Sequence, residues 1–160
     1  MYLGGTNGNS TLTGKIFENK TDLKTSLIKN NINIDDMIFI KQYDFPNYFF
    51  EQTNEKMETI FGKKFLPDEA VIYNNNLLII EKKYQTTNGS VDEKLQTGPY
   101  KLEIFKECAK KLGLNKVKYC YLVNSDFFNT PKFTTHIIPW LKQHNIDVYF
   151  DSVPLEEILV

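Results

Sequence analysis

The segment PDEAVIYNNNLLIIEKKYQ, residues 67–85, decides the fold. It holds two apolar runs, 70–73 and 77–80, separated by the polar run Asn74 to Asn76. Asparagine tolerates the left-handed backbone conformation that tight turns require, so the pattern predicts a β-hairpin. The second run is apolar at every position, which is typical of a strand buried on both faces. We therefore expect a hairpin whose second strand lies inside a larger sheet.

The segments around the hairpin predict helices and further strands. Apolar residues recur at helical spacing over 15–28, 46–61, 99–112 and 131–144, with Gly113 placed to cap the third helix and Trp140 expected in the core. Strands are expected near 37–41, 117–123 and 146–150. This order favours an α/β fold, a mixed β-sheet core with flanking helices. Residues 1–13 lack periodicity and are expected to form a flexible arm, and residues 14–160 a single domain.

Composition excludes several classes of protein. The chain has 160 residues and 18.7 kDa, with 41% hydrophobic and 24% charged residues, which is ordinary for a soluble domain. No run approaches the roughly 20 apolar residues of a membrane helix, and the first residues lack the layout of a signal peptide. Cys108 and Cys120 have no metal-ligand spacing and are expected to be buried thiols. We expect a soluble, intracellular (cytoplasmic) protein with no membrane partner.

Charge is unevenly distributed. The net charge is −1, yet residues 81–118 hold nine lysines against five acidic residues. All 19 basic residues are lysines, so the bidentate contact of arginine with guanine is absent and Lys, Asn and Gln would have to read base edges. The basic segment can bind phosphates or form an ordinary solvated face, and its composition leaves both interpretations open.

The hairpin gathers charged residues at one strand end. If it folds about Asn75, Asp68 lies opposite Lys82 and diagonal to Glu81 and Lys83, and a shift of one residue would place it opposite Glu81 or Lys83. Glu81 and Lys83 share a face because side chains alternate along a strand. Two carboxylates are suitable ligands for Mg²⁺.

These residues carry a resemblance to a known family. Pro67-Asp68, followed after 12 positions by Glu81-Lys82-Lys83, resembles the PD-x(n)-ExK signature of the PD-(D/E)xK nuclease superfamily, which has the restriction-endonuclease-like fold. The stretch from Gly14 to Glu18 is similar to the GxxxE element of that superfamily's first helix, and Gln85 extends the signature to ExKxQ. Residues 89–96 and 150–159 resemble segments of some type II restriction enzymes.

The resemblance implies a Mg²⁺-dependent endodeoxyribonuclease, with Mn²⁺ as a substitute, that leaves a 5′-phosphate and a 3′-hydroxyl. It implies that Lys83 orients or deprotonates the attacking water, with Gln85 beside it. The implied metal ligands are Asp68, Glu81, Glu18 and the backbone carbonyl of Lys82. The residues expected to contact DNA are Lys82, Lys94, Lys101, Asn124 and Ser125.

Three functions fit the sequence. A type II restriction endonuclease of this size would act as a homodimer on a symmetric DNA site, because cutting both strands requires two catalytic sites. A Holliday-junction resolvase or a DNA-repair nuclease would read the shape of DNA. A DNA-binding subunit with an inert nuclease fold would not cut, but like carboxylates held together are costly without a cation, which argues against it.

Overall fold

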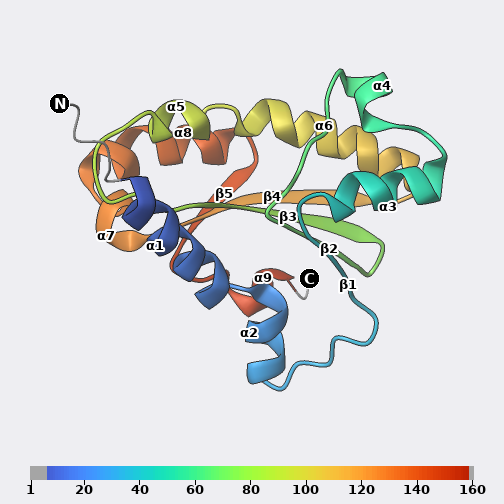
Figure 1. Cartoon of the computed structure of the whole chain (residues 1–160), viewed down its shortest axis with the longest axis horizontal. Helices are drawn as coiled ribbons and strands as arrows, with labels where there is room; N and C mark the ends of the chain where they lie inside the picture. Colours follow the sequence, from blue (N-terminus) through green and yellow to red (C-terminus); the bar gives the residue numbers. More distant parts are fainter. Residues whose placement is uncertain (1–6, 159–160) are drawn as a thin grey trace.

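The fold is built on one mixed sheet of five strands (Figure 1). The computed structural model describes residues 7–158, and side chains from residue 12 onward. The strand order is β1-β2-β3-β4-β5, with antiparallel pairing at the first two interfaces and parallel pairing at the last two. The strands are β1 (Ile38–Ile40), β2 (Glu69–Tyr73), β3 (Asn76–Lys83), β4 (Lys116–Val123) and β5 (Ile146–Phe150). The predicted fold class is confirmed.

Helices cover both faces of the sheet and make three layers (Figure 1). One face carries α3 (Asp44–Thr53), α4 (Met57–Phe61), α5 (Val91–Leu95), α6 (Gly98–Lys111), α7 (Ser125–Phe128), the π-helical segment η1 (Phe133–Ile137) and α8 (Ile138–Gln143). The other face carries α1 (Asn7–Lys20), α2 (Leu23–Lys29) and α9 (Leu155–Ile158). Within residues 7–158, no helix is long and apolar enough to cross a membrane.

The predicted hairpin is β2 and β3, joined by a two-residue turn. Tyr73 pairs with Asn76, and the turn residues Asn74 and Asn75 have φ angles of 49° and 61°. Positive φ at both positions is the geometry of the type I′ turn, which matches the twist of the flanking strands. Glu69 pairs with Ile80, so Asp68 precedes the last pair and faces Glu81. A turn centred on Asn75 would have placed Asp68 opposite Lys82, so the observed register is shifted from that one by one residue.

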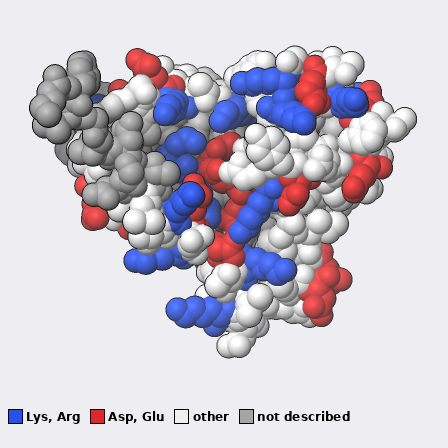
Figure 2. Space-filling model, viewed as in Figure 1, with Lys and Arg blue, Asp and Glu red and all other residues white. Residues whose placement is uncertain are grey.

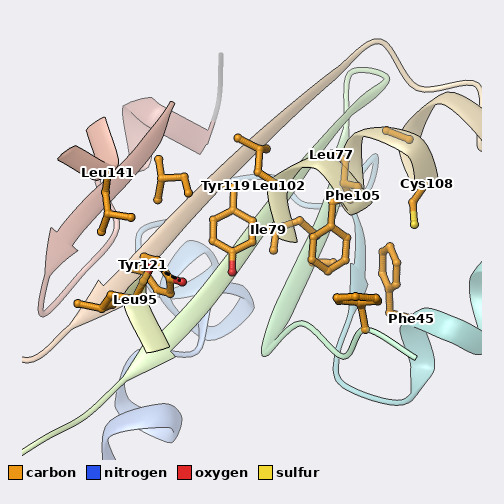
Figure 3. Packing of buried hydrophobic residues seen from close by; sticks show 14 of the residues in the cluster. Phe45, Leu77, Ile79, Leu95, Leu102, Phe105, Cys108, Tyr119, Tyr121 and Leu141 are labelled. Carbon is orange, nitrogen blue, oxygen red and sulfur yellow. Dashed lines mark hydrogen bonds between the residues drawn. The ribbon is translucent and has the colours of Figure 1, made fainter. Parts of the chain in front are cut away.

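The larger core lies between the sheet and the helices around α6 (Figure 3). Ile79, Tyr119 and Tyr121 project from β3 and β4 and are fully buried. Phe105 of α6 packs on Tyr119, with ring centroids 6.2 Å apart. This apolar support fixes β3 beneath α6, and β3 carries the Glu81 and Lys83 of the signature.

The amino-terminal prediction needs correction. The single helix expected over 15–28 is two helices, because Asp22 caps a new helix by accepting a hydrogen bond from the Thr25 N–H at 3.0 Å. The arm expected over 1–13 is helical from Asn7, since no proline interrupts the stretch and an existing helix extends at little cost. Residues 1–6 lie outside the described part.

The helix expected over 131–144 is also interrupted. Phe133 to Ile137 form a π-helical segment, in which the Ile138 N–H bonds to the Phe133 carbonyl five residues earlier. The extra residue in this turn rotates α8, so Leu141 is fully buried while Trp140 is 38% exposed. The prediction that Trp140 belongs to the core was therefore wrong. The cap at Gly113 was correct, with a φ of 73° just after α6.

Candidate active site

The carboxyl end of β3 presents charged side chains on both faces of the sheet. Glu81 and Lys83 point toward the α6 layer, where the Lys101 Nζ lies 3.5 Å from a Glu81 oxygen. Lys82 points to the opposite layer, where its Nζ donates to the Glu18 carbonyl at 3.0 Å. This alternation separates the three residues of the motif into two environments.

Asp68 is held immediately before β2 by two hydrogen bonds. Its Oδ2 accepts a hydrogen bond from the Lys82 backbone N–H at 2.7 Å. This bond takes the place of the backbone hydrogen bond from Lys82 to Pro67 that would form if the pairing of β2 with β3 continued past Glu69 and Ile80. Its Oδ1 accepts from the Gln42 Nε2 at 2.7 Å. The carboxylate is therefore oriented next to Glu81, its cross-strand neighbour.

Gln42 is a site residue that the sequence analysis missed. It has a φ of 50°, an unfavourable value for a residue with a side chain, and its N–H donates to the Pro67 carbonyl at 2.8 Å. Non-glycine residues held in this region often mark functional sites. No local pattern indicates Gln42, because it reaches Asp68 only through the pairing of β1 with β2.

Glu81 is the most unusual carboxylate of the site. Its side chain is 6% exposed, and the Lys83 and Lys101 Nζ atoms lie 3.4 and 3.5 Å from its two oxygens. Burial raises the pKa of Glu81 above its ordinary value, the nearby Asp68 charge raises it further, and the two lysines oppose this shift. A perturbed carboxylate beside a second carboxylate and two lysines is an arrangement found at catalytic sites.

The donor set fits a divalent cation. The Asp68 charge disfavours ionisation of Glu81, and a cation between the carboxylates would relieve this repulsion. Mg²⁺ takes one or two carboxylates and keeps several waters. The Lys82 N–H that binds Asp68 also places the Lys82 carbonyl on the Asp68 side of the strand. These three groups would hold the ion.

The Glu18 carboxylate does not join Asp68 and Glu81 in a three-carboxylate cluster among the described residues. Its side chain is exposed on α1 and lines a hollow with Lys83, Gln85 and Lys94. Among the described residues, no three His, Cys, Asp or Glu side chains gather closely enough to hold a metal ion. A cation bound by Asp68 and Glu81 would take its remaining ligands from backbone and water.

Comparison with known families identifies the superfamily of the chain. Residues 9–119 match the model of the PD-(D/E)XK nuclease superfamily domain, a span that holds Glu18, the hairpin and β3. The chain belongs to the PD-(D/E)XK nuclease superfamily. No curated protein and no solved structure matches the chain. The matched span includes Asp68, Glu81 and Lys83, which converge at the end of β3.

Within this nuclease domain, Lys82 is structural. Its Nζ lies 2.9 Å from a Glu69 oxygen, and both side chains are only 4% exposed. Glu69 also accepts a hydrogen bond from the Leu23 N–H at 3.1 Å. The Lys82 side chain points to the face of the sheet that α1 and α2 cover, so its ion pair with Glu69 supports a structural role, and its contact with DNA stays a prediction.

Asn124 is structural for a similar reason. Its side chain is 5% exposed, and it donates to the Gln85 carbonyl at 2.8 Å and accepts from the Gln85 N–H at 2.9 Å. Asn124 therefore fixes the backbone after β3, and its contact with DNA stays a prediction. The Gln85 side chain donates to the Thr87 carbonyl at 2.7 Å, and Ser125 is half-buried. The roles given to Gln85, Ser125 and Lys94 stay predictions.

Proposed function

We propose that the protein is a Mg²⁺-dependent endodeoxyribonuclease whose catalytic residues are Asp68, Glu81 and Lys83. The observation that carries the proposal is the convergence of two carboxylates and two lysines where β3 ends. Asp68 faces Glu81 in the hairpin register, and Lys83 and Lys101 lie within 3.5 Å of Glu81. Membership of a nuclease superfamily supports the same reaction.

The mechanism follows from the position of each group. Mg²⁺ bound here would acidify a water and neutralise charge on the phosphate. Asp68 and Glu81 would hold the ion, and Gln42 keeps the Asp68 carboxylate in one orientation. Lys83 lies beside Glu81, where its ammonium can orient the attacking water and stabilise the negative charge that grows on phosphorus. Water adds to phosphorus and the P–O3′ bond breaks, which yields a 5′-phosphate and a 3′-hydroxyl.

We further propose a restriction-type enzyme that acts on both strands of DNA as a homodimer. One domain of this size carries a single such constellation, so a cut through both strands in one encounter needs two copies. With no arginine in the chain, base contacts would fall to lysine and amide side chains.

The experiment incubates the full chain with supercoiled plasmid and linear viral DNA in Mg²⁺, in Mn²⁺ and in EDTA. Asp68→Ala is compared with Asp36→Ala, a matched change at an exposed aspartate between α2 and β1. Cleavage that needs metal, is lost in Asp68→Ala and is kept in Asp36→Ala supports the proposal. Cleavage that persists in Asp68→Ala, or no cleavage of any DNA, overturns it.

The same assay separates the kinds of nuclease. Discrete fragments of viral DNA, with sedimentation of a dimer on DNA, support a restriction-type enzyme. Cutting confined to four-way junctions or damaged duplexes supports a resolvase or repair nuclease instead. Binding to DNA that is equal with and without Mg²⁺, with no cutting of any substrate, identifies a DNA-binding subunit.

A further inference from the structure

A second group of lysines lies next to Glu81 and outside the nuclease signature. Lys63 and Lys64, between α4 and β2, line a hollow together with Lys101 of α6. Glu81 lines the same hollow, as do the apolar side chains of Phe65, Leu66 and Phe105. The hollow therefore lies between Glu81 and α6. Figure 2 shows acidic side chains near the middle of this face with basic side chains on either side of them.

Buried aromatic side chains pack beneath the hollow. Phe65 is 4% exposed and packs edge-on against Phe105, with ring centroids 6.4 Å apart. The Lys63 Nζ lies over the Phe65 ring, 4.9 Å from its centroid, and the exposed Tyr100 ring packs on the same residue at 6.2 Å. Charges above a low-dielectric surface interact more strongly with an anion than charges surrounded by water.

The positive charge of this hollow exceeds its negative charge. In the described part of the chain, Lys63 forms no ion pair with a carboxylate, whereas Lys64 pairs with Glu58 at 3.4 Å. Both members of that pair are 44% exposed, so the pair is weak and Lys64 can leave it. Lys101 contacts Glu81 at 3.5 Å. The lining of the hollow thus carries three lysines and one carboxylate, a net positive charge that favours an anion.

We propose that Lys63, Lys64 and Lys101 form a subsite for a backbone phosphate of the DNA strand, next to the phosphate that is cleaved. This inference rests on the proposed function and adds the residues that position the substrate strand. Lysine contacts to backbone phosphates fix the register of a protein on DNA without reading its sequence. The exposed Tyr100 hydroxyl, at the edge of the subsite, can donate to the same backbone.

The test measures DNA binding as a function of salt, in EDTA so that cleavage does not interfere. A labelled duplex of mixed sequence is titrated with the wild-type chain and with the double variant K63M/K64M. The matched control is K110M/K116M, which removes two exposed lysines, one in the last turn of α6 and one at the start of β4. Thermal unfolding of each variant checks that the fold is kept.

The subsite predicts a local effect. K63M/K64M is expected to bind about tenfold more weakly near 0.1 M salt, and its plot of log K against log salt should be shallower by about 1 to 2. The control should change neither value as much. Equal losses in both double variants, or an unchanged slope in K63M/K64M, overturns the subsite.

The outcome for the subsite is independent of the outcome for catalysis. Suppose that the wild type cuts no DNA, but the plot of log K against log salt is still shallower for K63M/K64M than for the wild type. The nuclease proposal then fails and the subsite stands. If the wild type cuts and K63M/K64M binds with the wild-type slope, the subsite fails and the nuclease stands.

Discussion

A substitution of Lys82 can show whether its side chain stabilises the fold or binds DNA. In the folded protein it forms an ion pair with Glu69 in which both side chains are 4% exposed. Lys82→Met would leave the Glu69 carboxylate buried beneath α2 with the Leu23 N–H and a more distant Lys41 ammonium at 3.7 Å. The prediction is that this variant loses stability and keeps its affinity for DNA.

The expected magnitude follows from burial. Removing one partner of a buried ion pair costs about 3–5 kcal/mol, because the remaining buried charge loses its closest counter-charge. For a chain of this size each kcal/mol lowers the midpoint of thermal unfolding by about 2–4 °C, so the shift should be about 10 °C. Lys82→Met with Glu69→Gln removes both charges and keeps an acceptor for the Leu23 N–H, so it should recover most of the loss.

The pH dependence of the loss has a defined sign. Burial raises the pKa of Glu69 in the folded protein, and Lys82 is the largest influence that lowers it. Without Lys82 this pKa rises further above the unfolded value, so the folded state binds an extra proton and loses stability as pH increases. The cost of Lys82→Met should therefore be largest at neutral pH and should shrink when acid protonates Glu69.

The assay is urea unfolding followed by circular dichroism at several pH values, together with the salt dependence of DNA binding. A variant with wild-type stability and a salt slope shallower by about 1 would refute the structural role and restore Lys82 as a phosphate contact. A double variant no more stable than Lys82→Met would refute the argument from the buried charge.

Three further predictions concern the site and its support. Glu81→Gln should abolish metal-dependent cleavage and should not lower the midpoint of thermal unfolding at pH 7. Burial and the Asp68 charge raise the pKa of Glu81, so its ionisation costs stability above about pH 4. A lower midpoint for this variant would contradict the argument. Gln42→Ala removes the 2.7 Å hydrogen bond to Asp68, so it should reduce kcat about tenfold and leave the affinity for DNA in EDTA unchanged. Weaker DNA binding at constant kcat would show instead that Gln42 contacts the substrate. Gly98→Ala would place a Cβ 2.7 Å from the Ile146 Cδ1, so the free energy of unfolding measured in urea should fall by about 1–3 kcal/mol. An unchanged free energy of unfolding would mean that α6 shifts to make room for the methyl group.

Local sequence signals were sufficient for the hairpin that carries the nuclease signature. The asparagine run between two apolar runs predicted the turn at Asn74 and Asn75, and side-chain alternation predicted that Glu81 and Lys83 share a face. The register differed by one residue, because the turn is centred between Asn74 and Asn75 rather than on Asn75. The approach of Asp68 to Glu81 did not depend on that difference.

The remaining errors come from contacts between distant segments. Alternation also places Lys82 on the opposite face of β3, but only the packing of α1 and α2 shows that this face is covered. Gln42 meets Asp68 across 26 residues of sequence, and no short pattern encodes that meeting. The exposure of Trp140 depends on one extra residue in the turn of η1, which helical periodicity does not reveal.

The two-residue turn between β2 and β3 also has a consequence for the order of folding. Hairpins close within about 1–10 μs, whereas the parallel pairing of β3 with β4 must first order the long crossover through α5 and α6. Asp68 and Glu81 belong to the fast, local unit. We therefore expect Asp68 and Glu81, the carboxylates of the proposed metal site, to meet before the sheet is complete. A divalent cation present during refolding should then speed formation of the native protein as well as stabilise it.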